Sequence, residues 1–308
     1  MALVSVIIPN FNHAPFLKER IDSVLNQTYK DFEIIILDDC STDNSREIIE
    51  SYRGNEKISK IIYNQENSGS TFKQWTKGIS YSEGDWIWIA ESDDWCSEFF
   101  LENLVNDLIK DSSIAFTYCQ SYIYEENNTV RVNWQKVPFK LRIEKEQFFN
   151  EFMLKGNAVY NASMVIFNKK LYHKLDSKEY LKYKYSGDWV FWTDMSRMGD
   201  VIRSSEILNN YRKSHNLNVS SKIMSNGLNF YEDVNALIYF EKRDYGKTDR
   251  IIKNYYFDYK QLKKKIPENS RIIIENNFKK YLGVKDSLIW DLEYIKYKLV
   301  NKLHVLMK

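Results

Sequence analysis

Three stretches decide the fold: VSVIIPNFN (residues 4–12), FEIIILDDCSTDNS (32–45) and GDWIWIAESDDW (84–95). Each holds a short run of β-branched or aromatic residues and ends in amide or carboxylate side chains, as a buried strand followed by a turn does. The first strand should span residues 3–8 and end at Pro9. Residues 15–27 then predict a helix, because their apolar side chains recur at helical spacing, namely Phe16, Leu17, Ile21, Val24 and Leu25.

The same alternation continues to about residue 113. Asn44 with Glu47 three positions later is typical of a capping box that opens a second helix. Strands are expected at 32–37, 58–63 and 86–90, with a third helix marked by Phe72, Trp75 and Ile79. Strands that alternate with helices predict an α/β fold, a mostly parallel sheet flanked by helices on both faces.

Polar side chains collect where these strands end. Parallel sheets bind ligands at the carboxyl ends of their strands, so these residues predict a ligand site. A divalent metal holding a diphosphate would offset the repulsion between the carboxylates, and their oxygens suit Mg²⁺ or Mn²⁺. A simpler alternative is that an Asp-Asp pair caps the next helix. The residues concerned are Asn10, Asn12, Asp38, Asp39, Asn67, Gly69, Asp93 and Asp94.

The pattern after residue 113 is mixed. Residues 114–124 and 162–167 read as strands and 144–154 as a helix. A further helix at 187–198 carries Trp189, Trp192 and Met195 along one face. Beyond Ser225 the sequence is helical and basic to its end.

Composition indicates an ordered protein of about two domain lengths. The chain has 308 residues with 44% hydrophobic and 15% aromatic residues, and its formal charge of +2 argues against a nucleic-acid-binding protein. Three cysteines without Cys-x-x-Cys spacing favour a reducing cytoplasm over a disulfide framework or a zinc site. No apolar stretch approaches the ~20 residues that cross a bilayer.

The motifs occur in an order that resembles family-2 glycosyltransferases with the GT-A fold. The similarity runs over VSVIIPNFN, FLKERIDSVLNQTYKDFEIIILDDCSTDNS (16–45) and NSGSTFKQWTKGISYSEGDWIWIAESDDW (67–95), and more loosely to about residue 221. The resemblance implies a GT-A domain at 1–225, with a nucleotide-sugar half (1–115) and an acceptor half (116–225). Residues 226–308 would form a basic helical C-terminal region.

The resemblance also implies a role for each strand-end residue. Asp39 would accept a hydrogen bond from the base, which suits uracil or thymine and also guanine, so UDP is favoured without being fixed. Asp93 would contact the ribose or metal-bound water, and Asp94 would bind Mg²⁺ or Mn²⁺. The first carboxylate of this Asp-x-Asp-like motif is either missing or supplied by Glu91. The remaining nucleotide-binding residues would be Pro9, Asn10, Phe11, Asn12, Asn67 and Gly69.

Three later segments resemble the family's catalytic and acceptor motifs. YKYSGDWVFWTDM (183–195) nominates Asp188 as the base that deprotonates the acceptor, although Gly187 replaces the commoner acidic neighbour and Asp188 could instead only cap a helix. GNAVYNASMVIF (156–167) and the helix after Asp188 suggest the acceptor-side residues Asn157, Ser163 and Trp189. YRKSHNLNVSS (211–221) suggests Arg212 for the diphosphate and His215 for the metal or the diphosphate.

The leading functional interpretation is an inverting, metal-dependent glycosyltransferase. It would move a sugar from a nucleotide-sugar, with UDP favoured, to a hydroxyl of a glycan or lipid-linked acceptor in surface polysaccharide synthesis. A sugar-1-phosphate nucleotidyltransferase is an alternative, but no Gly-rich triphosphate loop follows the first strand. A nonenzymatic module that binds sugar nucleotides or glycans is the third possibility.

The C-terminal region carries most of the positive charge. Residues 242–308 contain 17 basic and 8 acidic side chains, which leaves the rest of the chain acidic. A basic amphipathic helix of this kind either lies at the anionic inner face of a membrane or packs with a solvated basic side. Its apolar stripe consists of Ile289, Leu292, Ile295, Leu299 and Leu303.

Overall fold

A computed structural model describes residues 4–125, 129–132, 139–213 and 223–306, without the side chains at 284–287 and 300–306. The chain divides into two compact units, residues 1–215 and 216–308. Among the described residues, no helix combines the length and the apolar character needed to cross a membrane.

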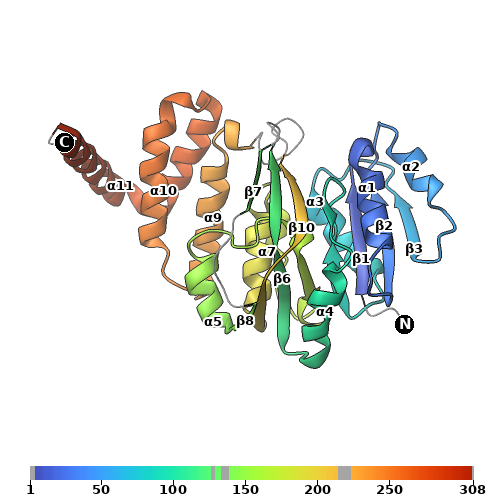
Figure 1. Ribbon diagram of the computed structural model, residues 1–308. Helices are drawn as coiled ribbons and strands as arrows, with labels where there is room; N and C mark the ends of the chain where they lie inside the picture. Colours follow the sequence, from blue (N-terminus) through green and yellow to red (C-terminus); the bar gives the residue numbers. More distant parts are fainter. Residues whose placement is uncertain (1–3, 126–128, 133–138, 214–222, 307–308) are drawn as a thin grey trace. The chain divides into compact units, whose positions relative to one another are not determined.

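The first unit is built on one sheet whose first four strands are parallel (Figure 1). Their order across the sheet is β3–β2–β1–β4, so all four carboxyl ends lie at the same edge. Almost every side chain of β1 and β2 is buried, because helices cover both faces. These strands are β1 (Val4–Asn10), β2 (Phe32–Asp38), β3 (Ile58–Tyr63) and β4 (Trp86–Ile89).

The second half of the sheet is mixed. β9 (Val165–Asn168) runs antiparallel to both β4 and β6 (Ile114–Glu125), and β10 (Asp200–Lys213) runs parallel to β6. The sheet thereby joins the two sequence halves without a break. Three short antiparallel strands complete it, namely β5 (Trp95–Cys96), β7 (Val130–Val132) and β8 (Lys140–Ile143).

Helices cover the two faces of the sheet. On one face, the ring of Trp88 in β4 lies 5.6 Å from the guanidinium carbon of Arg20 in α1 and 4.2 Å from the ring of Phe100 in α4. On the opposite face α3 packs on β1, and α7 packs on β6 and β9 through Trp192. The helices are α1 (Ala14–Leu25), α2 (Ser45–Ser51), α3 (Thr71–Tyr81), α4 (Phe100–Lys110), α5 (Lys145–Phe148), α6 (Lys169–Tyr172) and α7 (Gly187–Ser196).

The α/β fold is confirmed, but two local predictions about its turns are wrong. β1 continues through Pro9, which lies opposite Leu37, because the ladder to β4 has already ended and no N–H is needed on that side. Asn44 makes no capping hydrogen bond. The carboxylate of Asp43 accepts the N–H of Ser45 at 3.0 Å instead, and the N–H of Ala14 at 2.9 Å.

Three elements of the second half differ from their predictions. The helix expected at 144–154 is the short α5 followed by a π-helical turn, Phe149–Met153. The strand expected at 162–167 opens with a 3₁₀ turn, Ala162–Met164, before β9. The long strand β10 was not predicted, because its register shifts between Arg203 and Asn209 interrupt the alternation of buried and exposed residues.

The second unit is helical, as the sequence predicts. α9 (Asn229–Lys242), α10 (Asp249–Leu262) and the first part of α11 (Glu268–Leu306) enclose a small core. Gly283 has φ +71° and divides α11 at a kink. The fully or nearly fully buried side chains of this core include Val234, Leu237, Phe240, Ile252, Tyr259, Ile274 and Phe278.

Candidate active site

The loops after β1 and β2 are tied to each other. Asn10 donates its amide to the carboxylate of Asp38 at 2.8 Å and to the hydroxyl of Ser41 at 3.1 Å. Asn12 adopts φ +56° and accepts the N–H of Thr42 at 2.7 Å. The two asparagines therefore shape the loop, while the 44% exposed Phe11 between them offers a ring on which a base can stack.

Asp39 organises the loop that follows β3. Its carboxylate accepts hydrogen bonds from Asn64 at 2.5 Å, from the hydroxyl and N–H of Ser68 at 2.7 and 2.9 Å, and from Gln74 at 2.9 Å. The amide of Asn67 donates to the Asp39 carbonyl, and Gly69 takes φ +68° beside it. The structure thus brings Asp39, Asn67 and Gly69 together. Three of the four hydrogen bonds to the Asp39 carboxylate go to Oδ1, and Oδ2 accepts only that of the Ser68 hydroxyl.

Asp94 is the buried centre of the turn after β4. It is 1% exposed, and its Oδ2 accepts hydrogen bonds from Asn161 at 2.8 Å and from the Ser163 hydroxyl at 2.7 Å. Its Oδ1 accepts the N–H of Arg212 at 2.9 Å. Burial, and then the charge of Asp93, raises the pKa of Asp94 to about 6. Ser163 is fully buried, and its hydroxyl therefore helps to fix the position of the Asp94 carboxylate.

Glu91 and Asp93 lie in different surroundings within the same turn. Glu91 accepts a hydrogen bond from the Trp75 indole at 2.7 Å, and burial followed by the charge of Asp93 raises its pKa to about 8. The neutral form that this favours is a poor metal ligand. Asp93 is half-buried, and among the described residues no other side chain donates to its carboxylate. Burial also raises the pKa of Asp93, against the charges of Arg20 and Arg212.

Arg20 is a site residue that the sequence analysis missed. It is fully buried beneath the turn, donates Nε to the Glu91 carbonyl at 2.9 Å and places Nη2 3.9 Å from Oδ2 of Asp94. Neither terminal nitrogen has a hydrogen-bond partner among the described residues. The signal in the sequence was an arginine next to Ile21 on the apolar face of α1. Its charge offsets those of the buried carboxylates.

His13 is a second missed residue. Its Nδ1 lies 2.8 Å from the hydroxyl of Ser92, the first residue of the Ser-Asp-Asp motif. Burial lowers the pKa of His13, although the charges of Asp94 and Asp43 oppose the shift. A neutral imidazole therefore joins the loop after β1 to the turn after β4.

Arg212, on β10, contacts the turn after β4 that holds Asp93 and Asp94. Its guanidinium lies between the rings of Phe16 and Trp95, at 4.3 and 4.5 Å, and donates to the Asp93 carbonyl and to Glu19. Arg212 therefore contacts the turn of residues 91–94, which we call the carboxylate turn, but its role toward a diphosphate stays a prediction. His215 lies outside the described residues.

Asp188 occupies the first turn of α7. Its two carboxylate oxygens accept the N–H of Trp189 at 2.7 Å and the side-chain amide of Asn157 at 3.0 Å. The predicted base and one predicted acceptor-side residue are therefore in contact, and the base remains half-buried. Trp189 is buried and donates its indole N–H to the Met153 carbonyl at 2.8 Å, so it packs the helix in place.

The segment 157–161 links Asp188 to Asp94, because Asn157 donates to Asp188 at 3.0 Å and Asn161 donates to Asp94 at 2.8 Å. The pKa of Tyr211 is raised by burial and then by the negative charges of Asp94, Asp93 and Asp188, so one phenol on β10 senses all three. A cavity of about 60 Å³ adjoins Asn157 and is lined further by Tyr118, Gln120, Phe152, Ala158, Tyr160, Met164 and Arg203.

Helix α3 connects the three parts of the site. Gln74 bonds to Asp39, and Trp75 bonds to Glu91. Phe72 packs so closely on Gly187 that a Cβ there would lie 2.4 Å from its ring. The Asp39 carboxylate, the carboxylate turn of residues 91–94 and the helix of Asp188 therefore all contact one turn of α3, residues 72–75.

The donor set fits a metal that is completed by its substrate. In the part of the chain that the structure describes, no group of three or more His, Cys, Asp or Glu side chains is arranged to hold an ion. Among the described residues no side chain donates to the Asp93 carboxylate, and Oδ1 of Asp94 accepts the N–H of Arg212. One or two carboxylates supplemented by phosphate oxygens and water is the usual protein environment of Mg²⁺.

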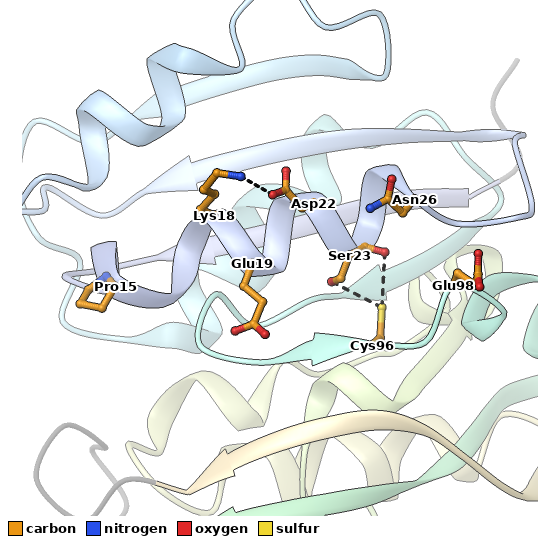
Figure 2. Close-up of a pocket in the computed structure, with 8 residues that line it drawn as sticks. All are labelled: Pro15, Lys18, Glu19, Asp22, Ser23, Asn26, Cys96 and Glu98. Carbon is orange, nitrogen blue, oxygen red and sulfur yellow. Dashed lines mark hydrogen bonds and ion pairs between the residues drawn. The ribbon is translucent and has the colours of Figure 1, made fainter.

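A separate hollow of about 790 Å³ lies along α1 and contains none of the predicted site residues (Figure 2). Glu19, the ion-pair partner of Arg212, is on its wall. Lys18 and Asp22, which also line this hollow, form an ion pair in which Nζ lies 2.5 Å from Oδ2. The hollow is lined by Pro15, Lys18, Glu19, Asp22, Ser23, Asn26, Cys96 and Glu98.

Known proteins share both the sequence pattern and the fold. The chain is 34% identical over 127 residues to the glycosyltransferase GlyG of Streptococcus pneumoniae, covering 41% of this chain and 42% of GlyG. It is 31% identical over 127 residues to TuaG of Bacillus subtilis, a glycosyltransferase named for teichuronic acid biosynthesis, covering 41% of this chain and 50% of TuaG. The chain thus spans half the length of these relatives or less.

Solved structures match over most of the chain. Staphylococcus aureus TarS 1–349 in complex with UDP-GlcNAc gives a TM-score of 0.65 at 18% identity, covering 91% of this chain and 80% of TarS 1–349. The mannosyltransferase PcManGT of Pyrobaculum calidifontis, in complex with GDP-Man and Mn²⁺, gives 0.55 at 14% identity, covering 97% and 86%. These likenesses establish the GT-A fold.

A family model supplies the remaining evidence. The model of glycosyl transferase family 2 matches residues 5–168, a span that contains most of β1, the carboxylate turn of residues 91–94 and all of β9. Because the match covers more than half of the sequence, the chain belongs to glycosyl transferase family 2.

Proposed function

We propose that the chain is an inverting glycosyltransferase that moves a sugar from a UDP-sugar to a hydroxyl of a glycan or lipid-linked acceptor in surface polysaccharide synthesis. The observation that carries the proposal is that one short segment, 157–161, bonds to carboxylates from two distant stretches of sequence: Asn157 to Asp188 and Asn161 to Asp94. The UDP-GlcNAc complex of TarS and the name of TuaG support the choice of donor and pathway.

Within this proposal the first 115 residues bind the donor. Phe11 stacks on the base, and Asp39 accepts its N3–H in place of Ser68 or Gln74. Asp94 holds Mg²⁺ or Mn²⁺, which when bound would neutralise charge on the diphosphate, and Asp93 contacts the ribose or metal-bound water. Arg212 contacts the diphosphate after leaving Glu19. His215 is the remaining residue predicted to bind the metal or the diphosphate.

Residues 116–225 complete the transferase domain and bind the acceptor. Asp188 takes the proton of the acceptor hydroxyl while that oxygen bonds to C1 of the sugar from the face opposite the diphosphate. The bond from C1 to the diphosphate oxygen breaks, and its electron pair leaves with the nucleoside diphosphate. Asn157 orients the carboxylate of Asp188 for this step. The product has the inverted configuration at C1.

The remaining parts of the proposal are the C-terminal region and the compartment. Residues 226–308 are a helical addition to the transferase domain. The cysteines Cys40, Cys96 and Cys119 are all unpaired, which favours a reducing cytoplasm.

The test is sugar-dependent release of nucleoside diphosphate by the full chain, with a panel of nucleotide sugars and either Mg²⁺ or Mn²⁺. Asp188→Asn should lower kcat by about 10²- to 10⁴-fold and leave donor affinity nearly unchanged, because only the proton acceptor is lost. The exposed Asp31→Asn is the matched control and should keep wild-type activity. Undiminished transfer by Asp188→Asn would remove that residue from the reaction, and tight UDP binding without turnover on any acceptor would favour the nonenzymatic alternative.

A further inference from the structure

The second half of α11 has two opposite faces with different surroundings. It begins at the kink at Gly283 and packs against α10 through aromatic rings. Trp290 lies 5.7 Å from the ring of Tyr256, and Tyr294 and Tyr297 each lie 5.5 Å from Phe257. One face of this helix is therefore fixed on the second unit.

The other face is an exposed apolar stripe. The exposed fractions of Leu288, Leu292, Ile295 and Leu299 are 61, 67, 54 and 58%. Their spacing of four, three and four residues places them on one side of a helix, and at 100° per residue this side is opposite Trp290 and Tyr297. We call these four residues the α11 stripe. Such a contiguous row of large apolar side chains is costly to leave in water.

Two acidic side chains of this segment, Asp291 and Glu293, are paired with lysines of α10. Asp291 accepts a hydrogen bond from Tyr256 at 2.6 Å and pairs with Lys260 at 2.6 Å, while Glu293 pairs with Lys253. Lys296 and Lys298 flank the stripe on either side, and neither has an ion-pair partner among the described residues. The charge beside the exposed apolar row is therefore positive.

We propose that the α11 stripe docks the chain onto a lipid surface that contains anionic headgroups. The four apolar side chains enter the boundary between headgroups and acyl chains, and the two lysines reach up to the headgroup phosphates with their methylene stems against the lipid. Residues 242–308 carry a net charge of +9, which adds long-range attraction to such a surface. The proposal goes beyond sugar transfer and does not depend on it.

A second copy of this chain fits the stripe less well than a bilayer does. The four residues follow a heptad pattern over only 12 positions, whereas a stable coiled coil needs three or four heptads. The next core position of that pattern is Lys302, which would place a charge in the seam. The flanking lysines would also repel their counterparts in many pairings.

The experiment is flotation of the full chain with phosphatidylcholine vesicles, with and without 30 mol% phosphatidylglycerol. We expect binding to the mixed vesicles that weakens at high salt and is at least tenfold lower on neutral vesicles. Leu292→Glu with Ile295→Glu should lower the partition coefficient at least tenfold, and Lys296→Gln with Lys298→Gln should lower it by about fivefold per lysine. Ile109→Glu, at a 51% exposed apolar site on α4, is the matched control and should bind like the wild type.

Unchanged binding of the Leu292→Glu, Ile295→Glu protein, or no binding of the wild type to either vesicle, overturns the proposal. So does a wild-type dimer in light scattering that the same two substitutions dissociate, because the stripe would then be an interface between copies. The lysine variant keeps every apolar side chain, so it tests the charge contribution even if the glutamate variant is misfolded by circular dichroism.

Discussion

Glu91→Gln should make the stability of the protein less sensitive to pH. Burial and the charge of Asp93 raise the pKa of Glu91 from 4.5 to about 8. Between these values the folded protein holds a proton on Glu91 that the unfolded chain has released, so the free energy of unfolding falls as pH rises. Glutamine cannot titrate, and its amide oxygen still accepts the Trp75 indole N–H. The variant should therefore lose less stability between pH 5 and pH 8.

The size of the effect follows from the position of the side chain. Each pH unit in this window costs at most about 1.4 kcal/mol. Because Glu91 is partly accessible to solvent, we expect a total of about 1–3 kcal/mol. Asp93 and Asp94 titrate in the same direction and remain in the variant, so its pH dependence is reduced without being abolished.

Urea unfolding at pH 5, 6, 7 and 8, followed by tryptophan fluorescence, measures the difference. Seven of the eight tryptophans lie in residues 1–215, so the signal reports the unit that contains Glu91. Glu47→Gln, at an exposed position of α2, is the matched control and should follow the wild-type curve. If the stability curves of Glu91→Gln and the wild type run parallel across this range, the buried proton on Glu91 does not exist.

Three further predictions concern the same site. Arg20→Met should lower the free energy of unfolding by about 3–5 kcal/mol at pH 7, because Asp94 loses its buried cation, and Arg20→Lys should lower it less; a loss below 1 kcal/mol in urea titration would contradict the pairing. Gly187→Ala should cost about 1–3 kcal/mol, seen as a lower melting temperature in calorimetry, because its Cβ would lie 2.4 Å from the ring of Phe72; an unchanged temperature would mean that the two elements are not in contact. Asp39→Asn should weaken UDP binding about 10- to 100-fold in titration calorimetry, since a charged acceptor is lost, and equal affinity would exclude Asp39 from the base pocket.

The sequence predicts those parts of the fold in which local pattern and burial agree. β1, β2 and β4 are mostly apolar runs buried on both faces, so their existence and order can be read directly, although β1 extends through Pro9 to Asn10. β10 escapes prediction because its pairing with β6 shifts register three times, which no local periodicity encodes. The Asn44 cap fails for a related reason, since the neighbouring Asp43 competes for the same N–H groups.

Site prediction has a similar limit. Residues at strand ends, such as Asp39 and Asp94, could be nominated because topology brings strand ends to one edge. Arg20 could not, because its function depends on a carboxylate 74 positions away that only the folded chain places 3.9 Å from it. The contact between Asn157 and Asp188 likewise joins segments whose spacing carries no signal. Their roles in catalysis stay predictions until the variants are measured.

The position of α3 has a consequence for engineering hybrid enzymes. Exchanging the acceptor half between relatives, to change what is glycosylated, cuts the chain near residue 115 and leaves Phe72 on one side and Gly187 on the other. A new half with any residue larger than glycine at position 187 would push α7 away from Phe72. Compatibility at the contacts that α3 makes across this junction, which also include Trp75 with Phe191 and Thr76 with Tyr180, should decide which chimeras fold.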